Sequence, residues 1–202
     1  MLIKQTTMVW VVALALVGGT ACSMTEFKST WKDPSAQAVQ LRGKTVGAFV
    51  VTRDQTLRRA GEDALATDLT KRGVNGIPGY RLVGPEQLTD RQAVRDRLRD
   101  AGAAAAVVMR VVSTRQQLSY TPGTGPYYGS FGGYWDNGWS TVGYATTDTI
   151  VRLETVVYSV EDDKLLWGGI SETFDPQKID SFIKEVADEA AKEMKKQGLI
   201  AQ

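Results

Sequence analysis

The stretch TIVRLETVVYSV at 149–160 is followed by EDDK at 161–164 and by LLWGGISETF at 165–174. In the first stretch, one face of an extended chain would carry Val151, Leu153, Thr155 and Val157, and the other Arg152 and Glu154. This period of two is typical of a strand with one buried face. Because EDDK supplies turn residues, we predict a β-hairpin in which 165–174 is the partner strand.

Before this hairpin, short apolar runs alternate with helical patterns. The runs at 45–51, 80–83 and 103–112 predict strands, and the third continues toward Tyr120. A helix is expected after the first run, capped by Asp54 or Thr56, ending at Gly73 and carrying Leu57, Ala60, Ala64, Leu65 and Leu69 at helical spacing. A second helix is expected from a capping box at 89–92 to Gly102.

A last helix is expected after the hairpin. Asp175 would cap it, Pro176 would take its first position, and Gly198 would end it. Its apolar stripe consists of Ile179, Phe182, Ile183, Val186, Ala190 and Met194. The predicted order is β-α-β-α-β-β-β-α, which indicates an α/β (α+β) fold with one mixed sheet packed against helices. We assign residues 41–202 to this single domain.

The N-terminus has the pattern of an export signal. Lys4 precedes an apolar run at 8–17, and small residues at 18–21 lead to Cys22. The run is too short for a membrane-spanning helix, which needs about 20 residues. Residues 1–21 are therefore predicted to be a cleaved signal peptide, and residues 22–40 a lipidated N-terminus and tether that leads to a periplasmic domain.

The residues around Cys22 resemble the lipobox of bacterial lipoproteins, although Gly19 stands where that motif usually has leucine. The resemblance implies a covalent lipid on Cys22, anchoring in the cell envelope, and sorting to the outer membrane because Ser23 follows the cysteine. An ordinary signal peptide with an incidental cysteine is the alternative. Stable anchoring takes more than one acyl chain, a condition that a triacylated cysteine meets.

Composition excludes several classes of function. Without residues 1–21 the chain loses one basic residue, Lys4, and keeps 23 basic and 23 acidic side chains, so we expect no binding to nucleic acid. The chain has no histidine and one cysteine, which removes Ser/His and Cys/His catalysis and the usual zinc sites. We expect no enzyme activity, no metal site and no cofactor other than the lipid.

Four stretches resemble an uncharacterised family of bacterial envelope lipoproteins: 29–34 (STWKDP), 57–65 (LRRAGEDAL), 147–150 (TDTI) and 163–167 (DKLLW). The element order is also similar to that of the curli-secretion lipoprotein and the lipoprotein activator of penicillin-binding proteins. The resemblance implies an envelope location and an α/β fold, and it assigns no activity.

A glycine- and aromatic-rich segment at 121–148 is the strongest candidate for a binding site. Between Tyr120 and Tyr144 lie 8 of the chain's 17 aromatic residues, together with seven glycines. A loop of this length is usually functional or disordered, and displayed rings anchor partners or sit at the headgroup level of a bilayer. The predicted partner-binding residues are Tyr127, Tyr128, Phe131, Tyr134, Trp135, Trp139 and Tyr144. The alternative is a loop that covers one face of the sheet.

The charged helix residues are expected to be solvated. Glu62, Asp63 and Asp68 are assigned to an exposed face of the first helix, and alternating charges on the second helix indicate surface ion pairs. The sequence thus predicts a membrane-anchored, non-enzymatic binding or adaptor module. Its partner would be an envelope protein, cell-wall glycan or the membrane face. A homo-oligomeric assembly protein and a histidine-free hydrolase are the alternatives.

Overall fold

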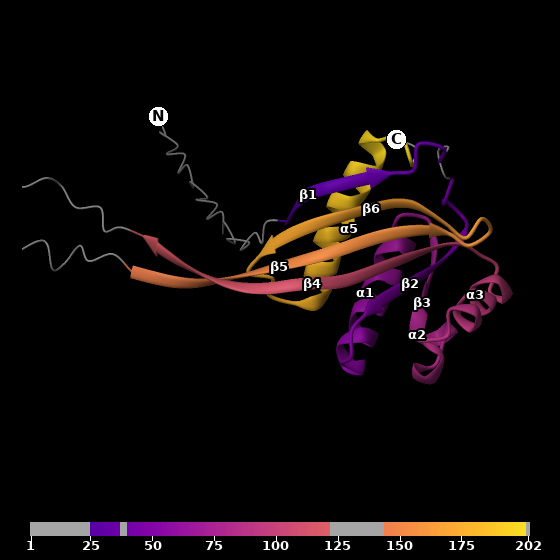
Figure 1. Cartoon of the computed structure of the whole chain (residues 1–202), viewed down its shortest axis with the longest axis horizontal. Coiled ribbons are helices and arrows are strands. Elements are labelled where there is room, and N and C mark those ends of the chain that lie inside the picture. Colours follow the sequence, from indigo (N-terminus) through magenta and orange to yellow (C-terminus); the bar gives the residue numbers. More distant parts are fainter. Residues whose placement is uncertain (1–24, 37–39, 122–143, 201–202) are drawn as a thin grey trace, which may run out of the picture.

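The computed structural model describes residues 25–36, 40–121 and 144–200 and has the predicted α/β class. One six-stranded mixed sheet runs in the order β1-β6-β5-β4-β2-β3 (Figure 1). Its elements are β1 (Thr25–Lys32), β2 (Thr45–Val51), α1 (Gln55–Lys71), β3 (Asn75–Pro78), α2 (Gly79–Leu82), a 3-10 turn (Pro85–Gln87), α3 (Arg91–Asp100), β4 (Ala103–Thr121), β5 (Tyr144–Ser159), β6 (Lys164–Phe174) and α5 (Ile179–Lys196).

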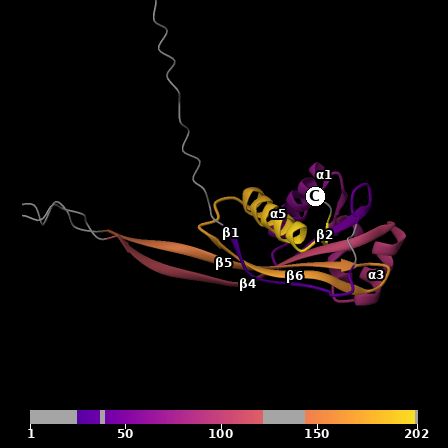
Figure 2. The same cartoon turned by 90° about the horizontal axis from the view of Figure 1, so that it is seen from above.

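The sheet separates two apolar clusters. The larger one lies under α1 and α5, where Val46, Leu65, Leu153, Trp167 and Val186 are buried together. The smaller one joins Phe49 of β2 to Leu98 of α3. In Figure 2, α1 and α5 lie together over one face of the sheet, whereas none of the described helices lies against the other face of β5 and β6. Among the described residues, that second face is therefore open over much of the sheet.

Strand pairing follows the connections. Strands β4 and β5 pair antiparallel, as do β5 and β6, whereas β2 is parallel to both β3 and β4 because helical connections return the chain in the same direction. The hairpin predicted from 149–174 is confirmed. Val151, Leu153, Thr155 and Val157 are buried on the α1/α5 face, as the alternation indicates.

Local signals correctly located several helix ends. The Asp54 side chain accepts hydrogen bonds from the backbone N–H groups of Thr56 and Leu57, so it caps α1. Gly73 and Gly198 follow α1 and α5 with φ of +80° and +68°, a conformation that favours glycine.

The predicted tether at 22–40 is wrong for residues 25–32. These residues form β1, an edge strand that pairs antiparallel with β6, from Thr25 opposite Thr173 to Lys32 opposite Trp167. Phe27 contributes to the core and meets Trp167 edge-on, with ring centroids 5.5 Å apart. The sheet therefore includes residues 25–32, and the element order gains a strand before the one at 45–51.

Three further boundaries differ from prediction. The strand expected at 80–83 lies at Asn75–Pro78, and the chain turns into α2 at Gly79. Asp90, rather than Thr89, caps α3 through the N–H groups of Gln92 and Ala93. The final helix begins at Ile179, because Asp175 has φ of +45° and its side chain accepts from Thr149 N at 2.5 Å instead of capping a helix.

Candidate functional site

Most of the predicted contact residues lie outside the residues that the structure describes. This holds for Cys22 and for Tyr127, Tyr128, Phe131, Tyr134, Trp135 and Trp139. Tyr144 is the first residue of β5, so the segment predicted at 121–148 is shorter than expected, and 144–148 are strand residues. The described part of the structure shows what carries this segment.

Strands β4 and β5 form a two-stranded arm, and the predicted contact segment lies in the sequence between them. Strand β2 leaves β4 at Arg110, and β6 leaves β5 at Ile150, but β4 and β5 stay paired as far as Thr121 and Tyr144. Figure 1 shows the two strands projecting together beyond the rest of the sheet. Six pairs in this two-stranded part, from 116/149 to 121/144, span about 17 Å at about 3.4 Å per residue.

A carboxylate ties the base of the arm to the sheet. Glu172 of β6 lies 3.4 Å from Arg115 Nη2 of β4 and 3.3 Å from Arg152 Nε of β5. The glutamate is buried, whereas both arginine side chains are about half exposed. One acidic group thus links three strands where the arm leaves the sheet.

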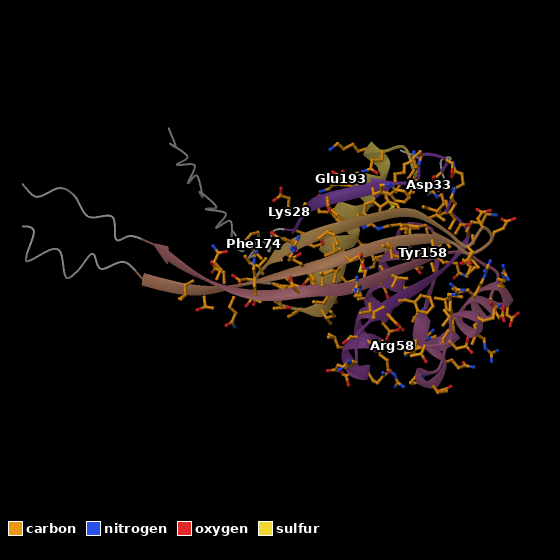
Figure 3. All side chains as sticks on the ribbon, in the orientation of Figure 1. Lys28, Asp33, Arg58, Tyr158, Phe174 and Glu193 are labelled. Atoms are coloured by element: carbon orange, nitrogen blue, oxygen red, sulfur yellow. The ribbon has the colours of Figure 1, made fainter. Side chains whose placement is uncertain are left out.

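The open face of the sheet displays aromatic side chains. Trp31, Tyr158 and Phe174 are 48%, 40% and 39% exposed. Tyr158 and Phe174 lie at opposite ends of the paired strands β5 and β6, as Figure 3 shows. Between them, Trp31 borders a shallow depression of about 280 Å³ that Gly168 and Ile170 also line. The Arg110–Glu154 ion pair, 2.7 Å, crosses β4 and β5 on the same part of the sheet.

The predicted solvated face of α1 is wrong for two of its three carboxylates. Glu62 is 0% exposed and Arg58 is 1% exposed, with Arg58 Nε donating to Glu62 Oε1 at 3.0 Å. Glu62 also accepts from the backbone N–H groups of Val50 (3.2 Å) and Tyr80 (2.6 Å). Asp68 is buried too and pairs with Arg72 at 2.6 Å; Asp63 is exposed, as expected.

Two of the four stretches that carry the family resemblance, 29–34 and 163–167, meet in space. Lys164 of DKLLW lies 2.7 Å from the buried carboxylate of Asp33 in STWKDP, and the flanking residues pair between β1 and β6. The Lys164 hydrogen bond, followed by those from the backbone and side chain of Ser35, lowers the pKa of Asp33 to about 2. In LRRAGEDAL, Arg58 and Glu62 form the buried pair. These motifs therefore have structural roles.

Within residues 25–36, 40–121 and 144–200, no group of three or more His, Cys, Asp or Glu side chains could hold a metal ion. None of the helices that the structure describes is both long and apolar enough to cross a bilayer. The buried carboxylate of Glu62 is occupied by three donors from its own chain.

No protein-family model matches the chain, and neither does any curated protein sequence. Among solved structures, it is similar to the PelC dodecamer from Paraburkholderia phytofirmans, at 12% identity over 90% of this chain and 100% of that one, with a TM-score of 0.46. Lipoprotein GNA1162 from Neisseria meningitidis is 10% identical over 76% and 99% of the two chains, with a TM-score of 0.43. Likeness at this level carries no argument about function.

Proposed function

We propose that the protein is an exported, lipid-anchored binding module of the bacterial envelope that carries out no chemistry of its own. Its contact surface is the β4–β5 arm together with the open face of the sheet. The observation that supports this proposal best is the arm itself. Two long strands continue past the sheet, and the aromatic segment lies in the sequence between them.

The start of β1 supports a position close to the membrane. Only two residues separate Cys22 from Thr25, the first residue of the sheet. Four consecutive residues reach about 10 Å when fully extended. A lipid on Cys22 would therefore hold this end of the sheet against the headgroup region.

The start of β1, next to the proposed lipid anchor, and the base of the arm lie at the same end of the sheet. Thr25 pairs with Thr173, and the neighbouring Phe174 pairs with Ile150 at the base of the arm. The aromatic segment would thus act near the membrane surface, where tyrosine and tryptophan rings are favoured. This arrangement suits a partner or lipid surface that is itself close to the membrane.

Lipidation is tested by intact mass and membrane fractionation of the wild type beside Cys22→Ser. We expect the wild type to lose residues 1–21, gain lipid mass and sediment with membranes, whereas the variant stays soluble. A cleaved, unlipidated and soluble wild type would refute the anchor.

Contact through the arm is tested with Trp135→Ala/Trp139→Ala in the full chain. Cross-linking in intact cells should recover fewer envelope partners from this variant, with unchanged thermal unfolding. A matched control is Leu57→Ala, which removes an exposed apolar side chain from α1, outside the proposed contact surface. Unfolding of the double variant would favour the alternative that these rings cover the domain.

Self-assembly by strand addition is opposed at the two outermost strands of the sheet, β1 and β3. Edge strand β1 carries Lys28 and Lys32 and a register shift between Phe27 and Ser29, and β3 is four residues long and ends at Pro78. Lysines, bulges and prolines are devices that keep edges from pairing. Sedimentation of the mature Cys22→Ser chain is expected to give a monomer, and a concentration-independent oligomer would favour the assembly alternative.

A further inference from the structure

A cavity lies on the opposite side of the sheet from the open face. It lies between α1, α5 and the strands β4 and β5, has a volume of about 450 Å³ and is partly open to solvent. Packed interiors contain few voids larger than a water molecule, and ligand sites usually occupy about 300–1,000 Å³. The volume of this cavity lies within the range of ligand sites.

The interior of the cavity is apolar because of what each element presents to it. Helix α1 contributes Leu65 and the strands contribute Met109 and Val157, each no more than 2% exposed. Helix α5 presents Ala187 and Ala190, whose small side chains leave the space unfilled. A cavity of about 150 Å³ lined in this way binds benzene. The larger volume has room for a longer chain of methylene groups.

The solvent-exposed lining residues are mainly basic. Arg42, Arg72 and Lys195 line the cavity and are exposed. Arg72 is engaged by Asp68 and Asp188, at 2.6 and 2.5 Å. Arg42 and Lys195 form no ion pair with any residue that the structure describes. Two cations are thus available for an anionic group at the rim.

One buried polar atom also points to an occupant. Thr155 lines the cavity and is 1% exposed, and its hydroxyl has no hydrogen-bond partner among the described residues. Buried hydroxyl groups are normally paired, and leaving one unpaired costs about 1–3 kcal/mol. A ligand oxygen, or a water held beside a ligand, would satisfy this group.

We propose that this cavity binds the single acyl chain of an anionic amphiphile, with its charged head group held at the rim by Arg42 and Lys195. The chain would lie against Leu65, Met109 and Val157. A free fatty acid and a lysophospholipid share this chemistry. The site is separate from the arm and the open face, so the proposal stands or fails independently of the proposed function.

The test is calorimetric titration of the mature Cys22→Ser chain with palmitate, with lysophosphatidylglycerol and with uncharged monopalmitin, each below the concentration at which it aggregates. We expect saturable one-to-one binding of at least one anionic probe, at least tenfold tighter than monopalmitin. Binding of palmitate alone would identify a fatty-acid site, and preference for the lysophospholipid a site for membrane-derived lipid.

Three variants test the geometry. Arg42→Glu/Lys195→Glu should weaken the anionic probe at least tenfold, whereas Lys196→Glu, an exposed lysine next to Lys195 that does not line the cavity, should leave affinity unchanged. Ala190→Trp should fill the cavity and abolish binding with the circular dichroism spectrum intact; if that variant does not fold, Ala187→Leu serves instead. No saturable binding, equal affinity for monopalmitin, or full binding by the folded cavity variant would each overturn the proposal.

Discussion

Arg58 and Glu62 lie one helical turn apart on α1 and form an ion pair that is removed from solvent, with Nε 3.0 Å from Oε1. The pair links three parts of the fold. Glu62 accepts from Val50 N at the end of β2 and from Tyr80 N in α2, and Arg58 Nη2 donates to Val83 O at 3.3 Å. It therefore fixes α1 and α2 to the end of the parallel strands.

Removal of either partner should be strongly destabilising. Glu62→Ala leaves the Arg58 guanidinium buried without a counterion, so we expect the free energy of unfolding to fall by about 3–5 kcal/mol in urea denaturation. The double variant Arg58→Met/Glu62→Leu should lose much less free energy of unfolding than the sum of the losses of the two single variants, because no charge stays buried. Asp63→Asn, one position away and exposed, is the control and should change stability by less than about 1 kcal/mol. A comparably small loss for Glu62→Ala would contradict the buried pair.

The carboxylate of Asp33 should make stability depend on pH in the acid range. Its pKa is about 2 in the folded protein, against 3.8 for the free group, chiefly because Lys164 and Ser35 donate hydrogen bonds to it. A folded-state pKa below the unfolded one means that the stabilisation is complete above about pH 4 and is lost as the pH falls through about 2.

An NMR titration of the Asp33 side chain should therefore give a pKa near 2, and Lys164→Gln should raise it. In Asp33→Asn, the part of the acid destabilisation that lies between about pH 4 and pH 2 should shrink. A titration midpoint at 3.8 or above in the wild type would show that the Lys164 contact does not form in solution.

Two buried threonines of the sheet should respond to the same substitution with opposite signs. The Thr155 hydroxyl is unpaired, so Thr155→Val should stabilise the ligand-free protein by about 1 kcal/mol. The Thr173 hydroxyl lies 2.7 Å from that of Thr25, so Thr173→Val should destabilise by about 1 kcal/mol. Midpoints of urea denaturation measure both, and destabilisation by Thr155→Val would mean that this hydroxyl is satisfied in solution.

Two strand glycines differ in the space around them. A Cβ on Gly76 would collide with the backbone of Ala66 in α1, including its Cα at 2.9 Å. Gly76→Ala should therefore push α1 from β3 and cost about 1–3 kcal/mol. A Cβ on Gly168 would meet only Val156 Cγ1 at 3.4 Å, so Gly168→Ala should be neutral or stabilising by up to about 1 kcal/mol. Thermal unfolding of both variants distinguishes them, and equal effects would contradict the close approach at Gly76.

Local patterns were enough for much of the fold. The period of two at 149–160 identifies β5 and its buried face, the Asp54 cap begins α1, and Gly73 and Gly198 follow α1 and α5. Each of these signals depends on backbone geometry within a few residues, so the sequence alone contains it. Composition also predicted the contact residues; all of them except Tyr144 lie outside the described residues, so this stays a prediction.

Only the tertiary structure determined the rest. Residues 25–32 form an edge strand through backbone hydrogen bonds to β6. The side chains of these residues do not by themselves predict that pairing. Glu62 is buried because Arg58, Val50 and Tyr80 donate hydrogen bonds to it. The spacing of charged residues along one helix does not predict these contacts, since two of the three donors come from other parts of the chain. The cavity exists because Ala187 and Ala190 of α5 face β4 and β5 across the core. The sequence by itself determined the elements and the residues available to them; the packing of segments distant in the chain decided the edge, the buried charge and the cavity, because free energies of pairing and burial depend on contacts that no local pattern specifies.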